Sequence, residues 1–315
     1  MIQADGALPR AGPPARRAGS VRRLLRSEHL GGWAFIIPAL VLIVIFGLIP
    51  IVWGLILSFQ KASLLSPVRT WVGLRNYRAI PRDPLTRKVA ANTVIYTVMF
   101  VPISITLALF TASALNRKIR MIRFYRLAVF IPVVASTIAT GIMFLWLMDK
   151  DFGLANWVAG KAGLGPFGFF SSPTQALPSL VAMTVWGWLG FDVIIYLAAL
   201  QGVPHELIEA AAIDGAGRWS MFRNITLPML APATLLLVVW SSINALQLFD
   251  EVYFVTHGGP LDSTNVVVYR VFRLAFTSGS PQAGYAAAIA YLLFLVILVL
   301  TLIQFWLGNR FSHYA

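Results

Sequence analysis

Long apolar stretches alternate with short polar segments along most of this chain. A helix needs about 20 residues to cross the hydrocarbon core of a membrane. Six apolar stretches reach that length, so we predict an all-α integral membrane protein with about six transmembrane helices. The predicted spans cover residues 33–59, 93–115, 127–148, 177–200, 231–254 and 285–307.

The composition agrees with a membrane protein. Of the 315 residues, 58% are hydrophobic and 12% are charged, whereas soluble domains carry about 25% charged residues. The first apolar stretch is too long for the core of a signal peptide, and we expect it to be retained. The predicted organisation is a basic cytoplasmic tail (1–32), a first transmembrane helix (33–59), an external loop (60–92) and a transmembrane domain (88–307) that contains a coupling loop (201–228).

The net charge of +13 comes from bases that are spread over the tail and the loops. Because they do not form one face, we expect no nucleic-acid partner, and we expect the tail to contact anionic lipid headgroups. With both termini in the cytoplasm, fourteen bases lie inside and eleven outside. Seven of the outer bases lie between Lys61 and Lys88, against the positive-inside tendency, so the charge count alone decides the orientation weakly.

The sequence lacks the residue patterns of a catalyst. It has no cysteine, and its four histidines (His29, His205, His257 and His313) fall in tails or loops. No G-x-x-x-x-G-K-[ST] string is present, so no phosphate-binding loop of an ATPase is expected. We therefore predict no catalytic residue, no metal site and no cofactor in this chain, and we expect any energy source to be a separate polypeptide.

A polar segment lies between the fourth and fifth apolar stretches. Pro204 and Glu206 are residues that favour the first turn of a helix. Gly215 and Gly217 then interrupt the helix, and residues 218–224 can form a second short one. This pattern predicts a helical hairpin at the membrane surface.

The same segment resembles a known family signature. Permease subunits of binding-protein-dependent ATP-driven importers carry the string E-A-A-x-x-x-G-x9-I-x-L-P, and residues 209–228 match it without a gap. The resemblance implies that the hairpin docks onto a cytoplasmic ATPase. The residues that it implicates are Glu209, Ala210, Ala211, Asp214, Gly215, Ile225, Leu227 and Pro228.

Shorter strings extend the resemblance to the sugar-type permeases of that superfamily, in order along the chain. His257 occupies a position where the family often has glycine, which we interpret as a tolerated loop variation. The first outer loop is short, so no separate external domain is expected. The strings are V-G-L-x-N-Y (Val72 to Tyr77), N-T (Asn92 and Thr93), F-D (Phe249 and Asp250), T-x-G-G-P (Thr256 to Pro260) and G-Y-A (Gly284 to Ala286).

This resemblance implies a type I importer permease in the inner membrane of a prokaryote, with several spans and both termini cytoplasmic. It implies as partners a second permease subunit, related but different, and an external solute-binding protein. It also implies two cytoplasmic ATPase subunits, which would bind ATP and magnesium. The implied solute is a sugar or a relative such as a polyol, glycerol phosphate or glycerophosphodiester.

Ionisable residues inside the spans are few, and the fifth span offers the best candidate for a solute path. Trp240, Asn244, Gln247 and Glu251 fall within a narrow arc at 100° per residue. This stripe predicts either a solute path or amides that bind a neighbouring helix. Asp192 is the sole acidic residue that lies well inside a predicted span. We expect it either to pack against Trp186, Trp188 or Tyr196 of its own helix or to bind a solute or a proton.

Two rival functions remain at this point, a self-contained secondary carrier and a multispan membrane enzyme. A proton- or sodium-coupled carrier usually keeps several ionisable groups in mid-membrane. This chain keeps few there, and it lacks the catalytic patterns of an enzyme. The importer permease is therefore the favoured prediction.

Overall fold

The computed structural model describes residues 33, 35–63, 65–117, 120–277 and 282–311. It divides into two compact units, Met1–Gly54 and Leu55–Ala315. The predicted basic tail, residues 1–32, lies outside the described residues. In the first unit the described residues are helical, with a π-helical turn at Val44–Leu48, after which α2 (Ile49–Ser58) begins.

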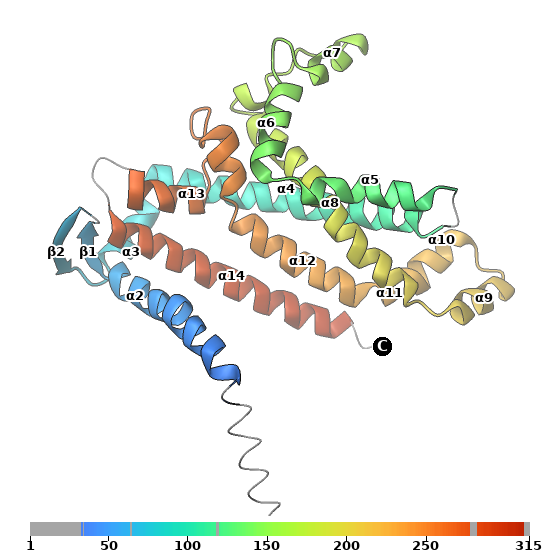
Figure 1. The fold of residues 1–315 in the computed structure, drawn as a ribbon, viewed down its shortest axis with the longest axis horizontal. Helices are drawn as coiled ribbons and strands as arrows, with labels where there is room; N and C mark the ends of the chain where they lie inside the picture. Colours follow the sequence, from blue (N-terminus) through green and yellow to red (C-terminus); the bar gives the residue numbers. More distant parts are fainter. Residues whose placement is uncertain (1–32, 34, 64, 118–119, 278–281, 312–315) are drawn as a thin grey trace, which may run out of the picture. The chain divides into compact units, whose positions relative to one another are not determined.

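Long helices form the framework of the larger unit. Figure 1 shows α4 (Pro84–Leu115), α12 (Ala231–Leu246) and α14 (Ala283–Phe311) lying side by side, and α12 packs on both of the others. Helix α8 (Ala176–Gln201) packs on α4 and on α5 (Ile122–Val134). Gly190 permits the close approach of α8 to α5, because a Cβ at this position would collide with the Val129 carbonyl.

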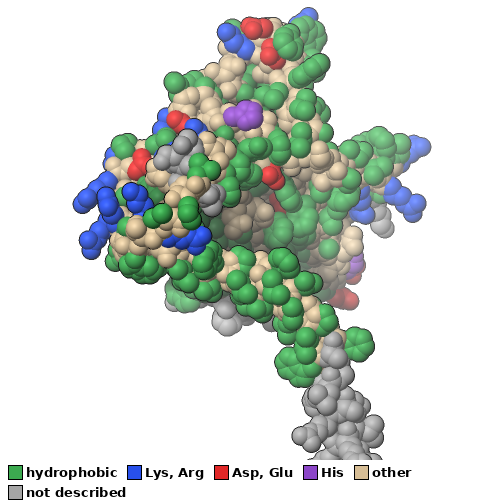
Figure 2. All heavy atoms as spheres, turned by 60° about the vertical axis from the view of Figure 1, so that its left-hand side comes forward, with side chains coloured by type: hydrophobic (Ala, Val, Ile, Leu, Met, Phe, Trp, Pro, Cys, Tyr) green, Lys and Arg blue, Asp and Glu red, His purple; other side chains and the backbone are tan. Residues whose placement is uncertain are grey.

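Most of the predicted spans are confirmed as helices. Among the described residues, four helices are long and apolar enough to cross a membrane, and two bent helix pairs would raise the number to six. The four run over Phe35–Ser58, Pro84–Leu115, Ala176–Gln201 and Ala283–Gly308. Figure 2 shows hydrophobic side chains over much of the visible surface, as expected for helices that face lipid.

The third predicted span, residues 127–148, is wrong as a single helix. It consists of α5 and α6 (Thr137–Leu147), which meet at 102°. Ala135 and Ser136 have extended backbones there, and the Ser136 hydroxyl caps α6 by accepting a hydrogen bond from the Ala139 amide at 3.2 Å. Hydropathy could not show this break, because apolar residues lie on both sides of it.

The fifth predicted span, residues 231–254, is also interrupted. Helix α12 ends at Leu246, and a further helical stretch closes with a π-helical turn at Val252–Thr256. At its other end, α12 is bent by 64° relative to the helical segment Arg218–Met229. The prediction of one continuous helix through Glu251 is therefore wrong.

Helix α4 begins nine residues before the predicted start at residue 93. Asp83 caps it by accepting a hydrogen bond from the Leu85 amide at 3.0 Å, and Pro84 occupies its first position. Arg87 and Lys88 hid this start from an argument based on apolar runs. The helix has 32 residues, with Pro102 in its interior, so it is about 48 Å long.

The first outer loop contains a small sheet, which the all-α prediction did not include. Strands β1 (Gln60–Ser63) and β2 (Ser66–Trp71) pair in antiparallel fashion, with Gln60 opposite Trp71. The short helices α3 (Arg75–Ala79), α7 (Leu154–Lys161) and α13 (Val267–Phe272) lie in other connections. The helical class of the protein is unchanged.

Candidate functional site

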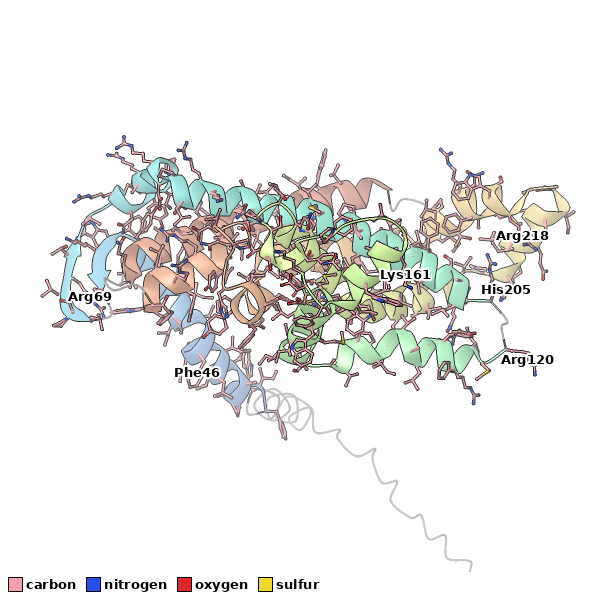
Figure 3. The ribbon with its side chains drawn as sticks, turned by 90° about the horizontal axis from the view of Figure 1, so that it is seen from above. Phe46, Arg69, Arg120, Lys161, His205 and Arg218 are labelled. Carbon is pink, nitrogen blue, oxygen red and sulfur yellow. The ribbon has the colours of Figure 1, made fainter. Side chains whose placement is uncertain are left out.

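The predicted helical hairpin is confirmed between α8 and α12. It consists of α9 (His205–Ile213) and α10 (Arg218–Met221), followed by a π-helical turn at Phe222–Thr226 and by α11 (Leu227–Met229). Figure 3 shows His205, Arg218 and Arg120 at one end of the larger unit and Arg69 at the opposite end. We call these the hairpin end and the strand end.

Gly215 closes α9 through a defined backbone motif. Its amide donates to the Ala212 carbonyl at 3.1 Å, and the Ala216 amide donates to the Ala211 carbonyl at 2.9 Å. This pair of bonds is a Schellman motif, which needs a left-handed residue, and Gly215 has φ of +79°. The glycine of the sequence signature is therefore required by the backbone, independently of any partner.

The hairpin exposes apolar side chains to its surroundings. Ile213 is 86% exposed and Trp219 is 67% exposed. Trp219 stacks on Phe222, with ring centroids 5.7 Å apart. Among the described residues, no side chain of α9 or α10 has a hydrogen bond or ion pair with another part of the fold. This open apolar surface has the character of an unoccupied interface.

The residues implicated in docking fall on two parts of this hairpin. Glu209, Ala210, Asp214 and Gly215 are exposed on α9 and its closing turn. Leu227 and Pro228 are exposed on α11, where the chain bends into α12, whereas Ala211 and Ile225 are partly buried. The signature thus covers both the tip of the hairpin and its root.

A second candidate site is a cavity of about 160 Å³ between α4, α8 and α12. All four predicted path residues, Trp240, Asn244, Gln247 and Glu251, line it. They line the same cavity although α12 ends at Leu246, before Gln247 and Glu251. A continuous helical stripe, as predicted, therefore does not explain why these residues lie together. The lining also includes Asp192, for which a solute role was one of the two expectations. The sequence argument missed other residues of the lining, which include Tyr96, Phe100, Thr184, Trp188 and Asp250.

A spacing of four residues could have identified one wall of the cavity. Thr184, Trp188 and Asp192 follow one another at successive turns of α8, so they share a face. A smaller cavity of about 80 Å³ shares Thr184, Trp188 and Glu251 with the first and extends to Pro132, where α5 and α6 meet. The polar lining therefore continues towards the bent span.

The hydroxyl groups of Tyr96 and Thr184 in the cavity lining differ in their hydrogen bonding. The Tyr96 side chain is 1% exposed, and its hydroxyl makes no hydrogen bond of normal geometry with any described residue. The nearby Thr184 hydroxyl donates to the Leu180 carbonyl at 2.9 Å. A buried phenol hydroxyl normally has a hydrogen-bond partner. The Tyr96 hydroxyl has none among the described residues, so it is available to a group that enters the cavity.

Asp192 has a different partner from those predicted. The Ser104 hydroxyl of α4 donates to Asp192 Oδ2 at 2.6 Å, and both residues are buried. Among the described residues, the hydrogen bond that ties Asp192 to a neighbouring helix comes from Ser104, and no hydrogen bond joins Asp192 to Trp186, Trp188 or Tyr196. Asp192 also lines the cavity, so the expected solute role stays a prediction. Ser104 and Asp192 are 88 residues apart in the sequence, so local sequence spacing could not predict their contact.

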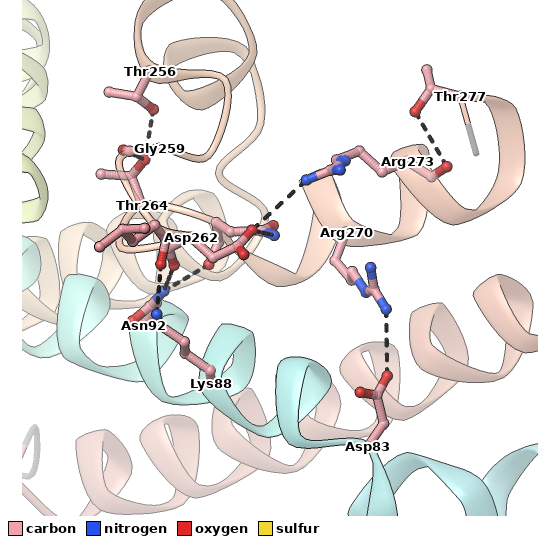
Figure 4. Close-up of polar contacts among 12 residues, drawn as sticks. Asp83, Lys88, Asn92, Thr256, Gly259, Asp262, Thr264, Arg270, Arg273 and Thr277 are labelled. Atoms are coloured by element: carbon pink, nitrogen blue, oxygen red, sulfur yellow. Dashed lines mark hydrogen bonds and ion pairs between the residues drawn. The ribbon is translucent and has the colours of Figure 1, made fainter. Parts of the chain in front are cut away.

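The N-T string lies towards the strand end, and its polar groups pair within the chain, whereas Asp250 of the F-D string lines the cavity. Asn92 Nδ2 donates to the carbonyls of Asp262 and Asn265 at 2.8 and 3.0 Å, and Thr93 Oγ1 accepts from the Val267 amide at 3.0 Å. Figure 4 shows the contacts of Asn92 with the loop before α13. The N-T string thus fastens that loop to α4.

An acid at the start of α4 links three elements. Asp83 pairs with Arg270 of α13 at 3.4 Å (Figure 4). It also accepts a hydrogen bond from the Tyr285 hydroxyl of α14 at 3.3 Å. Burial raises the pKa of Asp83, but hydrogen bonds from Thr86 and Leu85 and the charge of Arg270 outweigh it and hold the pKa below its ordinary value.

Two further strings serve the β-hairpin. Asn76 Nδ2 donates to the carbonyls of Ser58 and Gln60 at 2.8 and 3.0 Å, and the hydroxyls of Tyr77 and Ser58 are 2.7 Å apart. A Cβ on Gly284 would collide with the Gln60 carbonyl. The V-G-L-x-N-Y and G-Y-A strings are thus explained by packing within this chain.

His257, the departure from the family pattern, adopts a left-handed backbone with φ of +50°. Glycine adopts this conformation without strain, which explains its frequent use there, and histidine is one of the residues that tolerate it. The interpretation of His257 as a tolerated variation agrees with this geometry.

Comparison with known proteins defines the class. Residues 86–313 match the family model described as "Binding-protein-dependent transport system inner membrane component". The chain belongs to this family, and it is a permease subunit of an ABC transporter, distinct from the ATPase. It is therefore a multi-pass protein of the inner membrane.

Individual relatives narrow the comparison. The chain is 36% identical to the lactose transport system permease protein of Rhizobium radiobacter, over 91% of this chain and 97% of the relative. It is 33% identical to the arabinooligosaccharides transport system permease protein of Bacillus subtilis, over 95% of each. In fold it resembles a chain of a bacterial ABC transporter involved in the import of the acidic polysaccharide alginate, with a TM-score of 0.80, 22% identity and coverage of 92% of this chain and 99% of that one.

Proposed function

We propose that this permease conducts a carbohydrate through the cavity between α4, α8 and α12. The observation that carries the proposal is the lining itself: exposed indoles of Trp188 and Trp240 lie beside the amides of Asn244 and Gln247. Apolar ring faces and a few convergent polar groups are typical of sites that bind sugar rings and hydroxyls. The unpaired Tyr96 hydroxyl supplies one further hydrogen-bonding group. Relatives named for lactose and arabinooligosaccharide transport support the solute class.

The open hairpin supports a role in energy coupling. In this proposal α9 inserts into a cytoplasmic ATPase subunit, with Glu209 at the rim of the contact and the small Ala210 and Ala211 against the partner. Two such ATPase subunits bind ATP and magnesium, and one of them docks on a second, related permease chain. An external binding protein delivers the solute, as the family description implies.

Alternating access follows from a movement of the hairpin. ATP binding closes the ATPase pair, and the hairpin root at Leu227 and Pro228 transmits the displacement to α12, which lines the cavity. The path then opens outward, and hydrolysis returns it to the inward-open state. In this orientation the hairpin end and both termini are cytoplasmic.

The test replaces Asn244 and Gln247 together with leucine in the complete importer. Uptake is measured in proteoliposomes with the cognate binding protein and a panel of labelled neutral di- and trisaccharides. Each hydrogen bond lost to solute costs about 1 kcal/mol, so transport per assembled complex should fall several-fold or more.

A matched control is Gln304→Leu. Gln304 Nε2 of α14 donates to the Ser242 hydroxyl of α12 at 3.0 Å, outside the cavity lining. This change should reduce thermal stability and leave uptake per complex unchanged. If the double variant behaves like the control, the amides only join helices and the path assignment is wrong.

A further inference from the structure

Acidic residues line the cavity, and the described residues of its lining include no lysine, arginine or histidine. The acidic side chains are those of Asp192, Asp250 and Glu251. The smaller adjoining cavity again has Glu251 and no basic residue among its described lining. The path proposed above is thus bordered by carboxyl groups from α8 and from the stretch after α12.

Ionised carboxyl groups accept hydrogen bonds and donate none. They suit sugar hydroxyls, which can donate, and they repel carboxylates and phosphates at close range. The interior of a membrane protein screens this repulsion less than water does. A uronate or a sugar phosphate would therefore be disfavoured, whereas a neutral sugar would be accepted.

We propose that this cavity discriminates by charge, admitting neutral or cationic carbohydrates and excluding anionic ones. The inference rests on the proposed solute path. It narrows the solutes that the sequence implies, because it excludes glycerol phosphate and glycerophosphodiesters. The fold does not impose the choice, since the similar fold described above belongs to a transporter involved in the import of an acidic polysaccharide. The lining residues carry the discrimination.

The sign of the potential can be measured without knowing the solute. The native sequence has no cysteine, so Asn244→Cys places a single thiol on an exposed lining position. The assembled importer in membranes is treated with two methanethiosulfonate reagents of similar size, one carrying a trimethylammonium group and one a sulfonate. The ratio of their rates is divided by the same ratio for a small thiol in solution, which removes their intrinsic difference.

The expected normalised ratio favours the cationic reagent by about tenfold or more, because each nearby charge acts on the two reagents in opposite directions. Asp250→Asn and Glu251→Gln, each combined with Asn244→Cys, should lower the ratio several-fold. Asp151→Asn is the matched control, since Asp151 is an exposed residue that does not line the cavity, and it should leave the ratio unchanged.

The outcomes separate this inference from the proposed function. A normalised ratio near one, when the native importer takes up carbohydrate, overturns the charge discrimination and leaves the path standing. A thiol at position 244 that reacts with neither reagent overturns both, because the cavity would then be closed to water-soluble molecules. Efficient uptake of a uronic-acid disaccharide by the complete importer would also overturn the charge discrimination.

Discussion

The two ends of the larger unit use the family's sequence strings in opposite ways. At the strand end, Asn76 and Asn92 each form hydrogen bonds with other elements of the same chain. At the hairpin end, the exposed Glu209 has no such contact among the described residues, and Ile213 and Trp219 are exposed. The polar side chains named at the strand end are thus paired within the chain, whereas the exposed side chains named at the hairpin end are available for contact with another protein.

This difference shows that a recurrent string can be explained in two physical ways. The strand-end strings stabilise the fold, because buried carbonyl groups would be left unpaired without their side-chain donors. The hairpin string has one position fixed by the fold, Gly215, while its other residues face outward. Variants at the two ends should therefore affect different measurable properties.

The largest effect is expected at the turn of the hairpin. Gly215→Pro cannot adopt a φ of +79° and loses the amide that donates to Ala212, so α9 should lose its closing turn. Uptake and solute-stimulated ATP hydrolysis should both fall to background while the protein still inserts. The matched pair is Gly215→Ala and Gly217→Ala: Gly217 has φ of −70° and free space around its Cα, so only the first should reduce coupling. Normal stimulation in Gly215→Pro would reject the docking role.

Sidedness separates the hairpin from the loop that carries α7. Single cysteines at Asp214 and Gly160 occupy exposed positions in an otherwise cysteine-free chain. A membrane-impermeant thiol reagent should label the first from the cytoplasmic side and the second from outside, with about a tenfold preference or more in each case. The reverse pattern in oriented vesicles would invert the proposed orientation.

A smaller effect is expected for the charge at the rim of the hairpin. Glu209→Lys reverses one exposed charge, and because exposed pairs contribute about 1 kcal/mol or less, coupling should fall several-fold and more strongly at low salt. Glu209→Gln, which only removes the charge, should lie between the variant and the native protein. Equal ATPase stimulation in all three proteins across salt concentrations would show that Glu209 makes no charged contact.

The smallest effect on coupling is expected at the strand end. Asn92→Leu removes the donor to two backbone carbonyls, at about 1–3 kcal/mol for each group left unpaired, so the melting temperature should drop by several degrees. ATP hydrolysis coupled to uptake, measured for each assembled complex, should stay near the native value. Lys88→Met, which removes one exposed contact to the Leu261 carbonyl, should change stability less. A coupling defect in Asn92→Leu without loss of stability would remove the distinction between the ends.

The sequence predicted the features that depend on local composition. Apolar length identified α8 to within one residue at each end and the start of α14 to within two residues, because a membrane helix must be continuously apolar. Gly215 was predicted to end α9 because few other residues accept a left-handed backbone. The four stripe residues line one cavity, although the helix that was to align them ends at Leu246.

Other features depend on contacts between distant residues or on small local differences. The bend at Ser136 replaces two helical residues by extended ones within an apolar run, which changes no average over the segment. The Ser104–Asp192 contact and the convergence of Tyr96 with Trp188 need the tertiary arrangement of α4 and α8. The β-hairpin was missed because its strands contain few of the apolar residues that mark a strand.

Helix α4 is about 48 Å long, and Pro102 lies near its middle. Proline has no amide hydrogen, so the Val98 carbonyl lacks its normal helical donor and bending is easiest at this point. On one side of the proline, Asp83 and Asn92 tie the helix to the strand end; on the other, Ser104 ties it to Asp192 of α8. The two halves of α4 are thus attached to different parts of the protein. A bend at Pro102 would change the angle between the halves while both attachments stay in place.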